Sequence, residues 1–550
     1  MLGSLQDLRE ALQRGEAQWC VLALDYEFGV LTEPRAGWSH GALRERPGTL
    51  YRFSECREFD QSDAEQWLSQ ACANLPEEAL SCGIGGITPS CSVEEHRDAL
   101  RRIAAWIEAG DCYQVNFTYA LSFNWWGHPL ALYAALRARQ PVRHGGLLRT
   151  RDQTVLSLSP ELFLAREGER VWVRPMKGTA PRATDAEHLR LSSKNRAENL
   201  MIVDLLRNDL GKVAETGSVQ VESLFEIEDY PTVWQMVSQV GAKVAGKDAA
   251  DLLAAMFPCG SVTGAPKLRA MQIIDALETL PRGLYTGAFG LVRPGGDFCL
   301  NVPIRTLELD CDGRGKMGVG SGVVADSDPD AEWRECVLKA EFLSDFDPGL
   351  LLIETLRREN GVYPRLDGHL QRLASSATWL GFICDRADVE RQLHALPNAG
   401  TERVRLALDK QGRVDLRATP LDPEPQITRF ALLAQERIDA HHPLRRHKTS
   451  FRAPYDRALA SLAGNPSLFD CVFLNQEGEV VEGARSNVFV ERDGQLLTPP
   501  LSSGALPGVL RAELLAAGRA IEASLTLADL SSGFWMGNAL RGLIQVRLRG

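Results

Sequence analysis

The segment Asp-Phe-Asp-Pro-Gly at residues 345–349 separates two stretches of the chain with different patterns. Residues 330–342 before it have the pattern of a helix, whereas residues 350–356 after it form an apolar run typical of a strand. At 550 residues the chain is long enough for two to four cores. We therefore predict a domain boundary here, with a short, packed linker and a second domain over residues 350–550.

The part of the chain before this boundary mixes helical and strand patterns without strict βαβ alternation, which indicates an α+β fold. A weaker boundary in a Gly-rich stretch divides it into an N-terminal portion, residues 1–85, and a main domain, residues 86–346. Ser92 and Glu95 have the spacing of a capping box and predict the start of a helix. Residues 112–123 then alternate as in a strand.

The composition excludes several classes of protein. A net charge of -11 argues against a nucleic-acid partner, since phosphate binding needs a clustered basic face. No apolar run approaches the length of a membrane span, and residues 1–14 resemble an acidic amphipathic helix more than a signal peptide. The 12 cysteines lack metal-type spacing, which favours reduced thiols in a cytoplasmic protein.

The first half of the chain contains an ordered series of motifs that chance explains poorly. They are GDCYQVN at residues 110–116, SPE at 159–161, PMKGTAPR at 175–182, ENLMIVDLLRND at 198–209, GSVTGAPK at 260–267, YTGA at 285–288, IRT at 304–306, GSG at 320–322 and DSDP at 326–329. The series resembles the chorismate-utilising enzymes, which include anthranilate, isochorismate, salicylate and aminodeoxychorismate synthases. This resemblance implies an anthranilate-synthase-like fold and chorismate as the substrate.

The resemblance also implies a magnesium site formed by Glu198 and Glu335, with Glu332 nearby. Magnesium takes oxygen ligands and can hold a substrate carboxylate while drawing electrons through the conjugated ring. Glu332 and Glu335 are three residues apart and so share a helical face. Without the resemblance, acids spaced in this way on a helix are more often a solvated surface.

Further residues match positions that bind the substrate in the family. Arg305 and Tyr285 match positions that hold the pyruvyl-side carboxylate, and a guanidinium fork suits a carboxylate well. The main chain of Gly320, Ser321 and Gly322 would approach the anion closely. The remaining candidate contacts in these motifs are Thr179, Ser261 and Gln114.

Two positions select the reaction within the family. The third position of the Pro-x-x-Gly-Thr motif is usually Ala, and a lysine such as Lys177 is typical of aminodeoxychorismate synthase component I. Members that add water carry a lysine base where this chain has Gln114. We predict that Lys177 attacks carbon 2 of chorismate and expels the carbon-4 hydroxyl, which requires burial to lower the pKa of its amine. The alternative is a lysine that pairs with a carboxylate or is solvated.

Two expected groups are missing from the sequence. Relatives often carry a histidine where this chain has Gln235, so no proton donor is assigned there. The chain also lacks the Gly-x-Cys-x-Gly nucleophile of glutamine amidotransferases. Ammonia therefore has to come from solution or from a separate amidotransferase subunit.

Residues 350–550 resemble the class IV aminotransferase-like fold, which includes branched-chain and D-amino acid aminotransferases and aminodeoxychorismate lyase. The resemblance implies an α/β domain that binds pyridoxal 5'-phosphate. Lys448 matches the lysine that binds the cofactor covalently, Glu482 the acid at the pyridine nitrogen, and Arg372 a phosphate ligand. Other matches, several at a second phosphate-binding turn, are Thr355, Ser486, Asn487, Val509 and Leu510, with Asn538 and Arg541 as possible substrate contacts.

Together, these features predict a bifunctional enzyme that makes 4-aminobenzoate, the first half producing aminodeoxychorismate and the second removing pyruvate from it. By analogy with class IV domains, we expect a homodimer formed through the second half. The alternatives are an anthranilate synthase, a second domain that acts as a transaminase, and a second domain that only docks partners.

Overall fold

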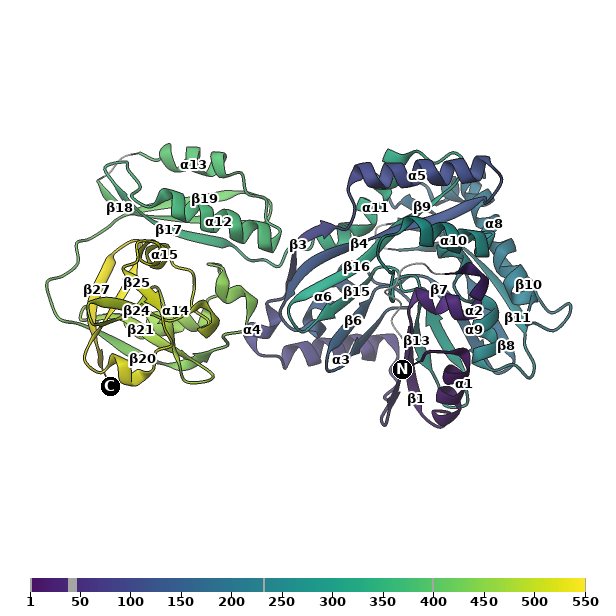
Figure 1. The fold of residues 1–550 in the computed structure, drawn as a ribbon, viewed down its shortest axis with the longest axis horizontal. Coiled ribbons are helices and arrows are strands. Elements are labelled where there is room, and N and C mark those ends of the chain that lie inside the picture. Colours follow the sequence, from purple (N-terminus) through teal and green to yellow (C-terminus); the bar gives the residue numbers. More distant parts are fainter. Residues whose placement is uncertain (1, 38–46, 231–232, 398–399, 550) are drawn as a thin grey trace. The chain divides into compact units, whose positions relative to one another are not determined.

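The computed structural model describes residues 2–37, 47–230, 233–397 and 400–549. Parts of the expected portions 1–85 and 350–550 therefore lie outside the described residues. The chain divides into two compact units, which are described separately (Figure 1). Unit 1 consists of Met1–Pro76 and Ile87–Phe346, and unit 2 of Glu77–Gly86 and Asp347–Gly550.

Unit 1 contains two antiparallel sheets. The first has the strand order β10-β11-β8-β7-β14-β13-β1-β2, with β9 paired to β11. Its strands are β1 (Trp19–Leu24), β2 (Gly48–Phe53), β7 (Leu162–Glu167), β8 (Arg170–Arg174), β9 (Met176–Pro181), β10 (Gln220–Asp229), β11 (Val233–Lys243), β13 (Ala288–Val292) and β14 (Phe298–Asn301). Because Cys20 of β1 lies opposite Val292 of β13, an N-terminal strand shares a sheet with residues 272 positions later.

The second sheet of unit 1 has the order β12-β4-β16-β15-β6-β5. Its strands are β4 (Gln114–Trp126), β5 (Gly146–Arg149), β6 (Gln153–Ser157), β12 (Gly264–Ala265), β15 (Thr306–Asp310) and β16 (Arg314–Val323). The long pair β4 and β16 places Gly322 opposite Asn116. The strand expected at residues 112–123 is thus β4, which begins two residues later.

Helices flank both sheets of unit 1. They are α1 (Leu5–Arg14), α2 (Gly29–Thr32), α3 (Gln61–Ala73), α5 (Val93–Glu108), α6 (Pro129–Arg139), α7 (Ala186–Leu191), α8 (Ser193–Gly211), α9 (Ala249–Met256), α10 (Lys267–Leu277) and α11 (Pro329–Ser344). The expected capping box of Ser92 and Glu95 is confirmed at the start of α5. Helix α11, the helix expected before the boundary, packs beside α5 and against β16 (Figure 1). It thereby brings its acidic residues near the Gly-rich strand.

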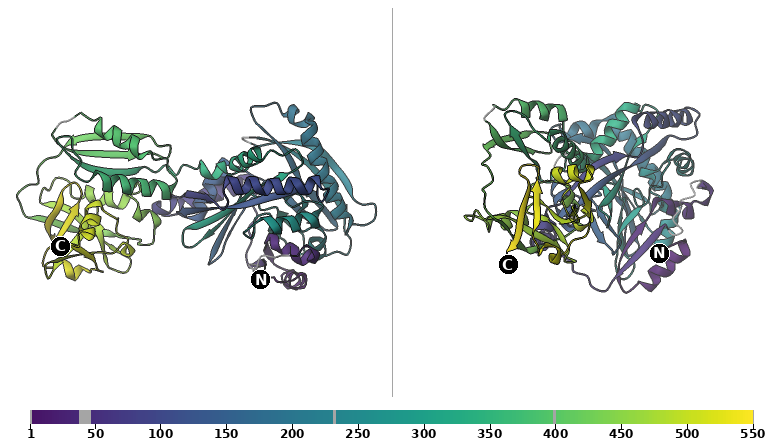
Figure 2. Two further views of the ribbon diagram at one scale, coloured as in Figure 1. Left: turned by 45° about the horizontal axis from the view of Figure 1, so that its top comes forward. Right: turned by 60° about the vertical axis from the view of Figure 1, so that its left-hand side comes forward.

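Unit 2 has two layers of its own, coloured green and yellow (Figure 2). The first contains β17 (Leu352–Glu359), β18 (Thr401–Leu408) and β19 (Val414–Pro420) with α12 (Leu366–Leu380) and α13 (Arg386–His394). The second sheet has the order β22-β21-β20-β27-β26-β23-β24-β25, in which β20 is parallel to both neighbours. Its strands are β20 (Arg429–Ile438), β21 (Leu468–Asn475), β22 (Val480–Gly483), β23 (Asn487–Arg492), β24 (Gln495–Thr498), β25 (Ala520–Glu522), β26 (Phe534–Asn538) and β27 (Gly542–Arg549).

Three short elements complete unit 2. Helices α14 (Ala453–Ala460) and α15 (Val509–Ala516) belong to the second layer, whereas α4 (Glu77–Leu80) comes from a segment surrounded in sequence by unit 1. The segment continues into β3 (Gly83–Pro89). All 12 cysteines are unpaired thiols, and within the described part of the chain no helix is long and apolar enough to cross a membrane.

Candidate active sites

Lys177 lies on β9, where pairing with β11 fixes the backbone around it. Gln235 of β11 lies opposite Thr179. The side-chain amide of Gln235 donates to the Gly178 carbonyl over 3.0 Å and accepts a 2.9 Å hydrogen bond from the Thr179 hydroxyl. Gln235 therefore replaces the family's histidine with a group that holds the lysine loop, and the hydroxyl of Thr179 is engaged by Gln235.

The side chains of Lys177 and Gln114 meet above Gly322 of β16. A methyl group on Gly322 would lie 3.5 Å from Lys177 Nζ and 3.0 Å from Gln114 Nε2. Gln114 is 2% exposed, and its Nε2 has no hydrogen-bond acceptor among the described residues. A buried donor of this kind normally has a partner, so its position is suited to an oxygen of a bound molecule.

Charged groups surround the Lys177 amine. Burial lowers the pKa of Lys177, the positive charge of Lys339 lowers it further, and the carboxylates of Glu161, Glu198 and Glu335 oppose the shift. Lys339, which the sequence analysis did not single out, donates to Glu335 over 2.7 Å and to the Gly320 carbonyl over 2.9 Å. The net direction is the one that a nucleophilic amine requires.

Ser261 and Glu161 form a buried pair in the same region. The Ser261 hydroxyl, in the short helix η3 (Gly260–Val262), donates to Glu161 Oε1 over 2.7 Å. Burial raises the pKa of Glu161, while Ser261 and Lys177 counter this shift. Glu161 was part of a predicted motif but had no predicted role, since its nearness to Lys177 depends on the fold.

The expected metal ligands do not form a three-carboxylate cage. Glu332 accepts a 2.6 Å hydrogen bond from Ser327, and Glu335 pairs with Lys339. Within the described ranges no group of three acids, cysteines or histidines is arranged to hold a metal. Glu198 and Glu335 still act together on Lys177, and magnesium is commonly bound by one or two carboxylates plus substrate and water. These two residues fit that mode of binding, and Glu332 is not needed for it.

The two residues predicted to hold the pyruvyl-side carboxylate, Arg305 and Tyr285, have different neighbours. Arg305 has a left-handed backbone with φ of 50° and is half-buried, and its guanidinium has no ion pair or hydrogen bond to another described residue. Burial lowers its pKa, and a buried cation of this kind is suited to a carboxylate ligand. Tyr285 packs against Gly318, where any side chain would overlap its ring. Gly318 and Gly322 are four apart on one strand, so Tyr285 and Lys177 share a face of β16.

Ser321 lies on the alternate face of β16. It is 1% exposed and lies beside the Cys336 thiol of α11. Its hydroxyl therefore points away from Lys177, and only the main chain at this position can contact a ligand near the lysine.

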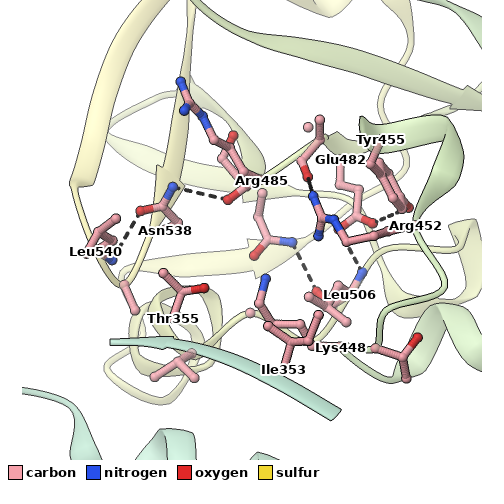
Figure 3. Close-up of a pocket in the computed structure, with 18 of the residues that line it drawn as sticks. Ile353, Thr355, Lys448, Arg452, Tyr455, Glu482, Arg485, Leu506, Asn538 and Leu540 are labelled. Carbon is pink, nitrogen blue, oxygen red and sulfur yellow. Dashed lines mark hydrogen bonds between the residues drawn. The ribbon is translucent and has the colours of Figure 1, made fainter. Parts of the chain in front are cut away.

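A cavity of about 470 Å³ in unit 2 contains most of the residues predicted for the second half (Figure 3). The predicted residues that line it are Thr355, Arg372, Lys448, Glu482, Ser486, Asn487, Val509 and Asn538. Leu510 does not line it, because its side chain packs with Phe489 and Leu514. Arg541 pairs with Glu424 at 2.8 Å and is also outside the lining.

Lys448 reaches this cavity from a segment that follows the short helix η4 (Pro443–Arg446). The Ile353 N–H of β17 donates to the Lys448 carbonyl over 2.8 Å, so the segment with the lysine is held against the strand that carries Thr355. Burial lowers the pKa of Lys448 to about 8, assisted by the positive charges of Arg372 and Arg452. A substantial fraction of this amine is therefore neutral near physiological pH.

Glu482 is held by two hydrogen bonds. The Tyr455 hydroxyl donates to Glu482 Oε1 over 2.7 Å, and the Leu506 N–H donates to Oε2 over 3.0 Å (Figure 3). Burial raises the pKa of Glu482, and these two donors together with Arg445 and Lys448 counter the shift. Tyr455 is a functional residue that the sequence analysis missed, since it lies 27 positions from the acid it positions.

Arg372 is fixed by an acid that the sequence did not predict. Its guanidinium donates to both oxygens of Glu354, over 2.9 and 2.6 Å, and to the Pro507 carbonyl over 3.1 Å. Glu354 also lies 2.6 Å from His369 Nδ1. Although burial opposes it, Arg372 and His369 lower the pKa of Glu354 to about 2. The arginine thus joins α12 to the turn before α15.

The turn before α15 forms a cradle that fits a phosphate. Gly508 cannot accept a side chain, which would overlap Asn487, and the Asn487 amide donates to the Leu506 carbonyl over 3.0 Å. The first residues of α15 present free N–H groups at the cavity. The Ser486 hydroxyl donates to buried Asp470. Pyridoxal phosphate requires a lysine for covalent attachment, a carboxylate at its ring nitrogen and a site for its phosphate. This cavity contains a lysine, a carboxylate and the start of a helix.

Comparison with known protein families agrees with this division. The family model for chorismate binding enzymes matches residues 4–345, which is more than half of the chain. The chain belongs to this family. In this chorismate binding enzyme, residues 351–548 match the model for class IV aminotransferases. The predicted fold class, with an anthranilate-synthase-like part followed by a class IV part, is thereby confirmed.

Individual relatives match the first part of this chorismate binding enzyme. Aminodeoxychorismate synthase component 1 of Salmonella typhimurium is 41% identical over 249 residues, which cover 44% of this chain and 55% of the relative. Anthranilate synthase component 1 of Thermus thermophilus is also 41% identical, over 290 residues that cover 51% of this chain and 62% of the relative. The chain thus spans little more than half of these relatives, and identity alone does not select between the two reactions.

A solved structure supports the fold of unit 1. Anthranilate synthase component I from Streptococcus pneumoniae matches with a TM-score of 0.50 and 26% identity, over 58% of this chain and 79% of the other.

Proposed function

We propose that this chain converts chorismate and ammonia into 4-amino-4-deoxychorismate in unit 1, and then into 4-aminobenzoate and pyruvate in unit 2. The observation that carries the proposal is the Lys177 amine, because burial lowers its pKa. This amine lies beside Gln114, which stands at the position where relatives that add water carry a lysine base. An amine in this place favours attack by nitrogen on the ring over attack by water.

The chemistry in unit 1 follows from this placement. The neutral amine of Lys177 forms a bond to carbon 2, both conjugated ring double bonds shift toward carbon 4, and the carbon-4 hydroxyl takes up a proton and leaves as water. Ammonia then forms a bond to carbon 4 and the bond from carbon 2 to Lys177 breaks, so the lysine is regenerated. Gln114 can donate to the substrate, and Arg305 is available for a carboxylate. Glu198 and Glu335 would hold magnesium, which would polarise the bound carboxylate.

In unit 2 the second proposed reaction removes pyruvate. Pyridoxal phosphate, when bound, supplies an electron sink for the substrate's amine-bearing carbon. Lys448, with a pKa of about 8, takes the proton from carbon 4 of the substrate. The carbon–oxygen bond at carbon 3 then breaks, enolpyruvate leaves and takes up a proton to become pyruvate, and the ring becomes aromatic. Glu482 would keep a proton on the pyridine nitrogen of the bound cofactor, and the turn before α15 would hold its phosphate.

Other parts of the proposal rest on the family resemblance. Ammonia would come from a separate glutamine amidotransferase subunit, as the designation "component 1" of the relatives suggests. A homodimer through unit 2 is expected from the class IV match. The rival reaction in unit 1 is that of anthranilate synthase, and the rival for unit 2 is amino transfer.

Product identification tests both halves at once. Purified protein is incubated with chorismate, magnesium, an ammonium salt and pyridoxal phosphate, and the products are identified by mass spectrometry. We expect 4-aminobenzoate and pyruvate in equal amounts. Anthranilate would contradict the proposal for unit 1, and accumulation of aminodeoxychorismate would contradict the proposal for unit 2. Pyruvate-dependent transfer of an amino group would instead identify a transaminase.

A further inference from the structure

The segment 77–86 is part of the fold of unit 2, although the chain before and after it belongs to unit 1. It contributes α4 and the start of β3. Its residues 82–85 are buried, and Gly85 packs so closely on the end of α12 that any side chain would overlap the Leu380 backbone. Helix α12 carries His369 and Arg372, so the segment supports the element that presents Arg372 to the cavity.

Glu78 in this segment forms an ion pair with an arginine of the cofactor cavity. Arg445 Nη2 lies 2.6 Å from Glu78 Oε1, and the two side chains are 2% and 33% exposed. Arg445 lines the cavity and lies three positions before Lys448. Glu78 is the only carboxylate in an ion pair with Arg445 among the residues that the structure describes. A buried guanidinium needs such a partner, because an unpaired buried charge is strongly destabilising.

Arg445 connects this pair to the acid expected at the pyridine nitrogen. Its guanidinium lies over the Tyr455 ring, 5.4 Å from the ring centre, and over the Phe451 ring at 5.5 Å. Tyr455 in turn donates the 2.7 Å hydrogen bond to Glu482. The order Glu78, Arg445, Tyr455 and Glu482 is therefore a continuous series of contacts from the inserted segment to the cavity.

We propose that Glu78 is a positioning residue of the pyridoxal phosphate site, which neutralises Arg445 and thereby leaves Glu482 free to pair with the cofactor. The inference rests on the proposed function of unit 2. Without Glu78, the charge of Glu482, which already acts on Arg445, would draw the guanidinium toward the cavity. The acid would then be engaged by a guanidinium and would hold the pyridine nitrogen less well.

The test compares cofactor binding by full-length variants. Glu78→Gln removes the charge and retains the shape. Glu77→Gln is the matched control, because Glu77 pairs with Arg457 at 3.2 Å but both side chains are more than half exposed. Pyridoxal phosphate is added to the cofactor-free protein, and the visible absorption of the lysine-bound cofactor is followed. We expect binding by Glu78→Gln to be weaker by on the order of tenfold or more, since hydrogen bonds to charged groups contribute about that much. Glu77→Gln should bind like the unchanged chain.

A second pair of variants separates positioning from folding. In an Arg445→Met background, Glu78→Gln should have no further effect on cofactor affinity, because the two residues act through each other.

Formation of aminodeoxychorismate by unit 1 should be unaffected in Glu78→Gln. Equal affinity of Glu78→Gln and Glu77→Gln would overturn the inference, as would a joint loss of cofactor binding and unit 1 activity. If the unchanged chain shows no visible band, the proposed function of unit 2 fails instead.

Discussion

At the scale of single residues, the two proposed reactions each depend on one half-buried lysine with a lowered pKa. Both lysines could be predicted, because each lies in a motif with a recognisable order of neighbours. The residues that tune them could not. The contacts of Lys339 with Gly320, of Glu354 with Arg372 and of Tyr455 with Glu482 join residues 18 to 27 positions apart, which no local pattern encodes.

Replacing Lys177 with alanine should lower aminodeoxychorismate formation by on the order of 10²–10⁴-fold, which is the usual cost of losing a group that takes part in the reaction. The rate is measured from chorismate at saturating ammonium, with aminodeoxychorismate quantified by mass spectrometry. Lys247→Ala, at an exposed position of the same unit, serves as the control. An unchanged rate for Lys177→Ala would refute its role as the nucleophile.

The rate at which cofactor-free protein binds pyridoxal phosphate should rise with pH through about 8, since only the neutral Lys448 amine can react. Arg452 lowers the pKa of Lys448 by its positive charge. Arg452→Gln should therefore raise this pKa and move the rising limb to higher pH, and Arg452→Lys should move it less. Stopped-flow absorption at several pH values measures the rising limb for the unchanged chain and for each variant. A profile that does not depend on pH would contradict the expectation.

At the scale of elements, β16 brings the unit 1 site together because its glycines leave room for side chains from other elements. Gly318 accommodates the Tyr285 ring, and Gly322 accommodates Lys177 and Gln114. The sequence predicted close main-chain approach to an anion here. In the structure the same glycines also allow close approach of side chains from other elements, and this arrangement depends on which strands are adjacent.

Gly322→Ala should lower the rate of unit 1 by about 10-fold to 100-fold with little change in melting temperature. The new methyl group would lie 3.0 Å from Gln114 Nε2 and would push this amide away, while it would only touch Lys177 Nζ, and small misplacements of groups at a reaction site have effects of this order. Gly211→Ala, at the end of α8 with open space around it, is the control. A large loss of stability in Gly322→Ala would show that the site is packed more rigidly than this account requires.

Some elements could be predicted from the sequence, whereas the directions of the side chains on them could not. The capping box of α5, the strand β4 and the break before β17 were recognisable from spacing alone. The metal site was predicted at Glu198 and Glu335 with Glu332 nearby, which stays a prediction, and in the structure Glu332 accepts a hydrogen bond from Ser327. Helical spacing put Glu332 and Glu335 on one face, but Glu332 pairs with Ser327 before the helix and Glu335 with Lys339 one turn later, so the two carboxylates have different partners.

At the scale of the whole molecule, the sequence suggested two domains in succession, separated near residue 346. The assignment of residues 77–86 to unit 2 has no counterpart in the sequence pattern, because α4 has four residues and no distinctive motif. Its place in the fold depends on pairings such as that of Glu78 with Arg445.

This insertion means that the chain passes between the units three times, after residues 76, 86 and 346. A protease site engineered between Phe346 and Asp347 would divide the polypeptide into two pieces, one of which still carries part of the other's fold. We expect the pieces to co-elute in size-exclusion chromatography after cleavage and to separate only in denaturant. A gene that encodes residues 347–550 alone would yield unit 2 without the segment 77–86, which is part of its fold. The two units therefore cannot be separated or exchanged by cutting the gene at one point.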